Sequence, residues 1–192
     1  INWMAVATGK SLEHGGIRGR LQATGRGVKF CLKEFFRHPD ELKKYNIDGS
    51  YEDKKVSIQG WGNVGMNTGR SLNEDGVKII CVAEKEGMIF DEKGINIDNL
   101  IQYKEEKGSI TGFPDGKFNK DPNNSLYVEA DILIPAALEN AIVLENVNQV
   151  KVKLIVEAAN GPISFRANAE LKKRNIPIIP DIYANAGGVF VS

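Results

Sequence analysis

The sequence has few of the residues from which metal sites and disulfide frameworks are built. Its 192 residues include two cysteines and two histidines, and no His/Cys/Asp cluster suggests a metal. Cys31 lies in an apolar helical pattern and Cys81 in an apolar strand pattern. Both are predicted to be reduced thiols of the core, so we expect no disulfide, no metal ion and a cytosolic type of protein.

Net charge and long apolar runs are also missing. The 25 Lys and Arg residues balance 25 Asp and Glu residues, which gives no support for a nucleic acid or a membrane as a partner. No apolar run reaches the length of a membrane span. The chain has no starting Met, and Ile1 begins in mid-sequence. We therefore expect a piece of a longer protein, located in the cytoplasm, with the mitochondrial matrix left open.

The most informative motif is Gly60-Trp61-Gly62-Asn63-Val64-Gly65. It follows the apolar run Val56–Gln59 and opens a segment with helical character. A strand, a glycine turn and a helix in this order favour a dinucleotide site. Gly60 is expected to allow the tight turn, Gly62 to let backbone amides approach a pyrophosphate, and Gly65 to allow close packing of the helix. The start of the helix would offer its N–H groups to the phosphates.

A dinucleotide site of this type has an acidic residue at the end of its second strand, and this sequence has one there. The next apolar run, Val77–Ala83, ends at Glu84, nineteen residues after Gly65. A carboxylate there can accept hydrogen bonds from both adenosine ribose hydroxyls of NAD, and it would repel the 2′-phosphate of NADP. Lys85 is adjacent, so NADP is disfavoured but stays an alternative. The plainer interpretation of Glu84 is an ordinary surface carboxylate at the end of a strand.

Strand and helix patterns alternate along the chain. The predicted strands are Val56–Gln59, Val77–Ala83, Asp131–Pro135, Leu154–Val156 and Pro177–Ile179. The predicted helices begin at Thr24, at Asn63, at Asp98, around Asn140 and at Ser164, with capping by Thr24, Asp98 and Ser164. Residues 40–55 and 108–124 are predicted to be connections. This alternation predicts an α/β fold with a Rossmann-type, doubly wound, mostly parallel sheet and helices on both faces.

The segments that follow the predicted strands share one composition. Ligands of an open α/β sheet bind beyond the carboxyl ends of its strands. Gly, Ala and Asn dominate there, in residues 60–65, 135–137, 158–161 and 183–188, with Glu84 after the second strand. Small residues let a flat ring approach the backbone, and an asparagine can pair with a carboxamide in two directions. Each segment alone could be an ordinary turn, but five are predicted to converge on one edge.

These segments resemble the coenzyme-binding domain of glutamate dehydrogenases, in a family shared with leucine, phenylalanine and valine dehydrogenases. The resemblance covers nearly the whole chain, in seven segments that keep the family order: 8–10, 15–20, 23–27, 60–65, 130–137, 157–162 and 185–192. It implies that residues 1–22 lead in from a substrate-binding and catalytic domain outside this chain. It also implies that residues 23–192 form an NAD-binding Rossmann domain without its C-terminal helices.

The resemblance assigns roles to individual positions. Thr24, Ala136 and Ala137 correspond to residues around the nicotinamide, Asn160 to one that holds its ribose, and Asn185 to one beside the carboxamide and the substrate. The implied coenzyme residues are Thr24, Gly60, Gly62, Asn63, Val64, Gly65, Glu84, Ala136, Ala137, Asn160 and Asn185. The implied substrate residues are Arg20, Val189 and Ser192. Plainer interpretations are a helix cap for Thr24, a structural charge for Arg20, a turn for Asn160 and a chain end for Ser192.

The resemblance implies oxidative deamination of L-glutamate to 2-oxoglutarate and ammonia with NAD, in a homo-oligomer that is a hexamer in the family. The catalytic lysines and the aspartate of the family lie in the domain that this chain lacks. No catalytic residue is therefore assigned here, and we expect the isolated chain to be inactive. Two alternatives stay open. One is a leucine, valine or phenylalanine dehydrogenase, against which the hydroxyl of Ser192 argues; the other is a nucleotide-binding module without chemistry of its own.

Overall fold

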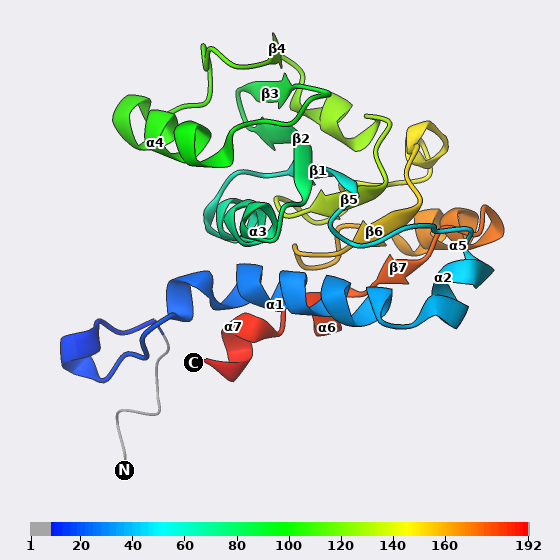
Figure 1. Ribbon diagram of the computed structural model, residues 1–192, viewed down its shortest axis with the longest axis horizontal. Helices are drawn as coiled ribbons and strands as arrows, with labels where there is room; N and C mark the ends of the chain where they lie inside the picture. The colour runs from blue at the N-terminus through cyan, green and yellow to red at the C-terminus, as the bar shows by residue number, and fades with distance from the viewer. Residues whose placement is uncertain (1–8, 192) are drawn as a thin grey trace.

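Seven strands form one sheet in the computed structural model, which describes residues 9–191 (Figure 1). The strands are β1 (Lys55–Gln59), β2 (Lys78–Glu84), β3 (Gly87–Phe90), β4 (Lys117–Asn119), β5 (Ile132–Pro135), β6 (Leu154–Val156) and β7 (Ile178–Ile179). Their order across the sheet is β4-β3-β2-β1-β5-β6-β7. The strands from β2 to β7 in this order are parallel, and β3 and β4 are antiparallel at one edge. The predicted α/β class with a mostly parallel, Rossmann-type sheet is confirmed.

Helices cover both faces of the sheet. They are α1 (Arg20–Phe36), α2 (Pro39–Lys44), α3 (Asn63–Glu74), α4 (Ile97–Lys107), α5 (Phe165–Lys173), α6 (Asp181–Ala184) and α7 (Gly187–Phe190). The described residues also form the short 3₁₀ helices η2 (Leu12–His14), η3 (Pro122–Leu126) and η4 (Val147–Gln149). In Figure 1, α1 runs beneath the sheet with α6 and α7 beside it. Within residues 9–191, no helix combines the length and the apolar character needed to cross a membrane.

The strands bury apolar side chains on both faces, as the continuous apolar runs predict. Successive side chains of a strand point to opposite faces. Ile132 and Ile134 of β5 therefore join one apolar cluster with residues of α1, α3 and α4. Leu133 between them joins a second cluster with residues of η4 and α5. Cys31 and Cys81 are free and buried, as predicted.

Two of the three predicted helix caps are wrong. The first helix begins at Arg20, after Gly19 in a left-handed conformation, so Thr24 lies inside α1 and caps nothing. The fourth helix is capped by Asn96, whose side chain accepts a hydrogen bond from the Asn99 N–H at 3.0 Å, and not by Asp98. The predicted cap of α5 is confirmed, because the Ser164 hydroxyl accepts a hydrogen bond from the Ala167 N–H at 3.3 Å.

Two predicted connections and one predicted helix are also wrong. Residues 140–147 form no α-helix, because the Asn146 side chain bonds the Val143 N–H and the Ala141 carbonyl and so competes with helical bonds. The segment 40–55 contains most of α2, which begins at Pro39, a residue suited to the first helical position. The segment 108–124 contains β4 and part of η3.

Candidate functional site

The strand order reverses beside β1. β2, the next strand in sequence, lies on one side of β1, and β5 lies on the other side. Open α/β sheets form a ligand crevice at such a reversal, so the crevice is expected between the carboxyl ends of β1 and β5. The glycine turn leaves β1 and Ala136-Ala137 leaves β5. Gly60 has φ +96°, and a Cβ on it would lie 2.8 Å from the Cβ of Ala137. The structure therefore brings these two predicted segments into contact.

Hydrogen bonds between neighbouring backbones fix the strand ends along this edge. The bonds run from Gly60 N–H to the Ala83 carbonyl at 2.9 Å, from Ala136 N–H to Gln59 at 2.7 Å, from Ala158 N–H to Pro135 at 3.0 Å and from Glu157 N–H to Ile179 at 3.0 Å. Each loop after a strand is thus tied to the strand beside it. Backbone hydrogen bonds therefore connect neighbouring segments along the edge that the sequence predicts to bind the ligand.

The glycine turn leads directly into α3. Gly62 is the N-cap residue and supplies no side chain to cap the helix, so the first N–H groups of α3 are left without partners within the helix. A Cβ on Gly62 would meet no atom within 4 Å. A Cβ on Gly65 would lie 1.8 Å from the Gly60 carbonyl oxygen, so α3 packs against the turn itself. The positive end of α3 is therefore open to an anion from the Gly62 side.

The side chain of Asn63 is already engaged by the protein. Its amide nitrogen donates to the Leu21 carbonyl at 2.9 Å, and its amide oxygen accepts from Asn67 at 3.0 Å. The bond to Leu21 holds the start of α3 against the start of α1. A coenzyme contact at Asn63 would therefore come from its backbone N–H. Val64 is half-buried and packs against the core, so a coenzyme contact at Val64 would also come from its backbone N–H.

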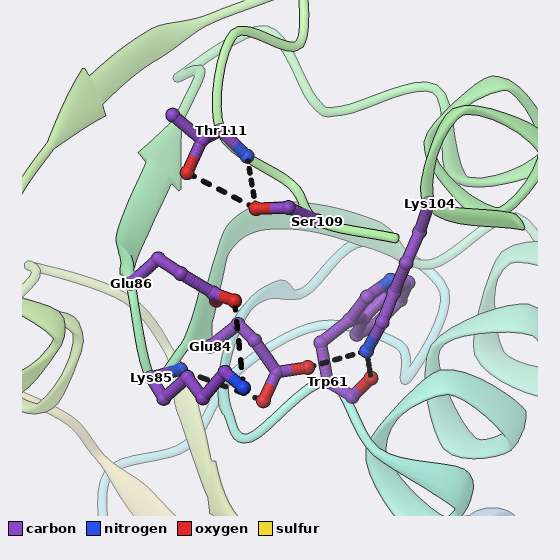
Figure 2. A network of polar contacts seen from close by, with 7 residues as sticks. All are labelled: Trp61, Glu84, Lys85, Glu86, Lys104, Ser109 and Thr111. Atoms are coloured by element: carbon purple, nitrogen blue, oxygen red, sulfur yellow. Dashed lines mark hydrogen bonds and ion pairs between the residues drawn. The ribbon is translucent and has the colours of Figure 1, made fainter. Parts of the chain in front are cut away.

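Glu84, the last residue of β2, forms an ion pair that the sequence did not indicate. Its carboxylate contacts the ammonium group of Lys104 in the last turn of α4, and that ammonium group also donates to the Trp61 carbonyl in the glycine turn (Figure 2). The side chains of Glu84 and Lys104 are 21% and 24% exposed. The Lys85 ammonium group lies 4.0 Å from Glu86 instead. The carboxylate expected to repel a 2′-phosphate is thus paired with a cation.

Asn160 and Asn185 lie side by side. The Asn185 amide nitrogen donates to the Asn160 side-chain oxygen at 2.7 Å. Asn160 belongs to the loop after β6, and Asn185 is the C-cap residue directly after α6. This bond uses one donor of Asn185 and the acceptor of Asn160. Among residues 9–191 it leaves the Asn160 amide NH₂ and the Asn185 oxygen as a donor and an acceptor suited to a carboxamide or a hydroxyl.

Arg20 and Thr24 lie one turn apart on α1, where α7 packs. A Cβ on Gly188 would stand 2.5 Å from the Thr24 hydroxyl oxygen and 3.0 Å from a terminal nitrogen of Arg20. The glycine thus packs closely against both side chains. Val189, the next residue of α7, is 76% exposed. Ser192, the remaining implied substrate residue, lies outside the described residues.

The part of the chain that the structure describes holds no group of three His, Cys, Asp or Glu side chains that could bind a metal ion. The remaining candidates for binding are the small residues, amides and backbone groups of the sheet edge. They suit a flat heterocycle, ribose hydroxyls and phosphates.

A family model described as Glutamate/Leucine/Phenylalanine/Valine dehydrogenase matches residues 15–192. The mitochondrial glutamate dehydrogenase of Dictyostelium discoideum is 44% identical over 192 residues, which are 100% of this chain and 38% of that protein. The NADP-specific glutamate dehydrogenase of Saccharolobus shibatae is 44% identical over 186 residues, 96% of this chain and 42% of that protein. The solved structure of the hetero-hexameric glutamate dehydrogenase of Thermus thermophilus in its Leu-bound form matches with a TM-score of 0.83. The identity is 26%, over 98% of this chain and 42% of that one.

The chain spans about two fifths of the length of these relatives. The family match covers nearly all of the chain, and it includes the glycine turn, the Ala136-Ala137 turn and the two asparagines. The chain belongs to the glutamate/leucine/phenylalanine/valine dehydrogenase family.

Proposed function

We propose that this chain is the coenzyme-binding part of a glutamate dehydrogenase that oxidatively deaminates L-glutamate to 2-oxoglutarate and ammonia. The observation that carries the proposal is the convergence of the glycine turn, Ala136-Ala137 and the Asn160–Asn185 pair on one edge of the sheet. The glutamate dehydrogenases among its relatives favour glutamate as the substrate.

The coenzyme would lie along the carboxyl edge of the sheet. Its pyrophosphate would accept hydrogen bonds from the first N–H groups of α3 beyond Gly62, and its adenosine ribose would contact Glu84. Its nicotinamide end would lie at Ala136-Ala137, with Asn160 and Asn185 around the ribose and the carboxamide. When bound, the coenzyme accepts the hydride from the substrate Cα; the protein holds and orients both reactants.

We propose NAD as the preferred coenzyme, with NADP accepted more weakly. Glu84 suits the ribose hydroxyls, while Lys104 offsets part of the charge that a 2′-phosphate would meet. One of the relatives is named NADP-specific, so the proposal rests on the side chains of this chain.

We propose that residues 1–22 lead in from a second domain and that residues 23–192 belong to the coenzyme domain. One face of the chain is suited to contact with further protein: the apolar side chains of Phe30, Ile182 and Phe190 are exposed on α1, α6 and α7. A groove of about 960 Å³ lies between these helices, and none of the implied coenzyme residues lines it. The second domain would supply the catalytic lysines and the other wall of the substrate cleft.

From the resemblance to glutamate dehydrogenases, we propose that the whole protein is a homo-oligomer, namely a hexamer. The Thermus thermophilus relative is a hetero-hexamer. A cytoplasmic location is proposed, with the mitochondrial matrix as the alternative, since the Dictyostelium discoideum relative is named mitochondrial.

Activity assays of the full-length protein and of this chain alone test the proposal. Both are assayed with glutamate, leucine, valine and phenylalanine, each with NAD and NADP. The full-length protein is expected to turn over glutamate, and the chain alone is expected to be inactive. The reason is that hydride transfer needs the reacting atoms held roughly 3–3.5 Å apart, which one wall of a cleft does not enforce.

Three outcomes would contradict parts of the proposal. Turnover by the chain alone would contradict the need for a second domain. A full-length protein that prefers leucine, valine or phenylalanine would replace the proposed substrate. A full-length protein that binds the coenzyme but acts on none of the four amino acids would favour the nucleotide-binding module.

A further inference from the structure

Two acidic residues tie together the loops that carry Asn160 and Asn185. Glu157 comes directly after β6, and one of its carboxylate oxygens accepts a hydrogen bond from the Asp181 N–H at 3.0 Å. Asp181 begins α6, and its carboxylate accepts a hydrogen bond from the Gly161 N–H at 2.8 Å. The two bonds run in opposite directions, one from each segment. The 2.7 Å bond between the asparagines joins the same two segments.

Glu157 is an unusual residue to find at this depth. It is only 7% exposed, and among residues 9–191 no Lys, Arg or His forms an ion pair with it. Burial and the nearby charge of the Asp181 carboxylate raise the pKa of the Glu157 carboxyl group, while backbone hydrogen bonds from Asp181 and Ile163 oppose that rise. A buried carboxylate that is held only by backbone donors costs stability compared with an apolar side chain of similar size. Packing alone therefore does not explain a glutamate here.

Asp181 is also more than a cap for a short helix. α6 spans four residues, and its N-cap residue, Pro180, makes no side-chain capping bond. The Asp181 carboxylate bonds the Ile182 N–H within its own helix at 2.6 Å, and its other oxygen reaches across to Gly161. Gly161 follows Asn160 directly, so this bond sets where the Asn160 loop stands relative to α6 and to Asn185.

We propose that Glu157 and Asp181 are positioning residues for the nicotinamide end of the coenzyme site, because they hold Asn160 and Asn185 at the spacing that makes them a single binding pair. This inference rests on the proposed function. Neither residue touches the coenzyme in this account. They act through the two asparagines, and through these on the ribose and the carboxamide.

The test compares a complete coenzyme with a fragment of it. NAD and ADP are titrated by calorimetry into the full-length protein, since ADP keeps the adenosine and the phosphates but lacks the nicotinamide and its ribose. Asp181→Ala removes the acceptor of the Gly161 bond. It is expected to weaken NAD binding by about fivefold or more, the effect of one net hydrogen bond, and to leave ADP binding unchanged. Asp181→Asn keeps an acceptor oxygen and is expected to retain most of the NAD affinity.

Glu157→Leu provides a second test that separates positioning from stability. The leucine is similar in size and removes the buried charge, which offsets part of the cost of leaving the Asp181 and Ile163 N–H groups without an acceptor, so thermal stability is expected to fall only slightly. NAD binding is nevertheless expected to weaken, again with ADP binding unchanged. Asp98→Ala, an exposed residue in the first turn of α4, is the matched control and is expected to change neither affinity.

The results also separate this inference from the proposed function. If Asp181→Ala and Glu157→Leu weaken NAD and ADP equally, or weaken neither, the positioning role is wrong while the coenzyme site stands. If the unaltered full-length protein binds neither NAD nor ADP, the proposed function is wrong and the inference is overturned with it.

Discussion

The backbone of Gly60 lies against Ala137, so that a Cβ on Gly60 would stand 2.8 Å from the Cβ of Ala137 and 2.9 Å from the Ala136 carbonyl oxygen. Gly60 begins the tight turn after β1, and Ala137 belongs to the turn after β5. The contact lies where the strand order reverses. In the proposed site it joins the turn for the pyrophosphate to the turn for the nicotinamide.

Gly60→Ala is expected to destabilise the chain by about 2–4 kcal/mol, because it combines an unfavourable positive φ with overpacking against Ala136-Ala137. Gly76→Ala is the matched control: Gly76 has φ +86°, but its Cβ would meet no atom within 4 Å. It is expected to cost only about 1–2 kcal/mol, the contribution of the backbone conformation. Urea denaturation measures both values. Equal losses would show that the turn after β5 moves aside freely.

Lys104→Met is expected to increase discrimination against NADP. Without the ammonium group, the Glu84 carboxylate would meet the 2′-phosphate uncompensated. Calorimetric titration is expected to show a loss of NADP affinity of about tenfold, with the NAD affinity changed much less. Glu84→Ser is expected to have the opposite effect and to narrow the preference for NAD.

Lys107→Met, in the same last turn of α4 but exposed, is the control for the loss of one positive charge. If Lys104→Met weakens NAD and NADP by the same factor, then the bond from Lys104 to the Trp61 carbonyl matters to both coenzymes. The idea of a charge effect on selectivity would then be wrong.

Asp75 is expected to make stability depend on pH. It is the C-cap residue directly after α3 and accepts hydrogen bonds from Lys29 at 3.2 Å and Lys33 at 3.1 Å on α1. Burial alone would raise the pKa of Asp75, but the bonds from Lys33 and Lys29 outweigh it and lower the pKa. Its contribution is therefore present above the pKa of an unfolded Asp, about 3.9, and is lost as the pH falls through the lower folded value.

Asp75→Asn is expected to cost about 1 kcal/mol at pH 7, and the difference from the unaltered chain is expected to shrink as the pH falls below 4. Denaturation curves at neutral and acid pH measure it. Asp40→Asn, at a fully exposed residue of α2, is expected to have no effect. A loss that is the same at both pH values would show that Asp75 contributes through packing and not through its charge.

The parts of the fold that the sequence predicts are those in which local pattern and burial agree. The strand β5 is an uninterrupted apolar run because both of its faces are covered. The antiparallel strands β3 and β4 have four and three residues at the edge of the sheet, and runs so short carry no readable alternation. The start of α1 was misplaced because Thr24 is a good cap locally, yet the helix begins one turn earlier at Arg20.

The candidate site likewise has residues that the sequence predicts and residues that it does not. The glycine turn and Glu84 follow spacing rules and were predicted. Lys104 lies twenty residues after Glu84 on another element, and only the packing of α4 beside the turn brings its ammonium group to the carboxylate. The Glu157–Asp181 bond likewise joins segments that are distant in sequence. Pairings of this kind depend on tertiary structure, and no pattern in a single sequence encodes them.

Calorimetric titration of NAD into the unaltered chain and into its Gly62→Val variant tests whether the glycine turn binds the pyrophosphate of the coenzyme. Gly62 has an extended backbone, with φ −81° and ψ −161°, which valine adopts readily. A Cβ on Gly62, the N-cap residue of α3, would meet no atom within 4 Å. The variant is expected to keep its circular dichroism and thermal stability, while its binding of NAD is nearly abolished because the side chain holds the pyrophosphate away. A folded Gly62→Val variant that binds NAD as tightly as the unaltered chain would contradict the account.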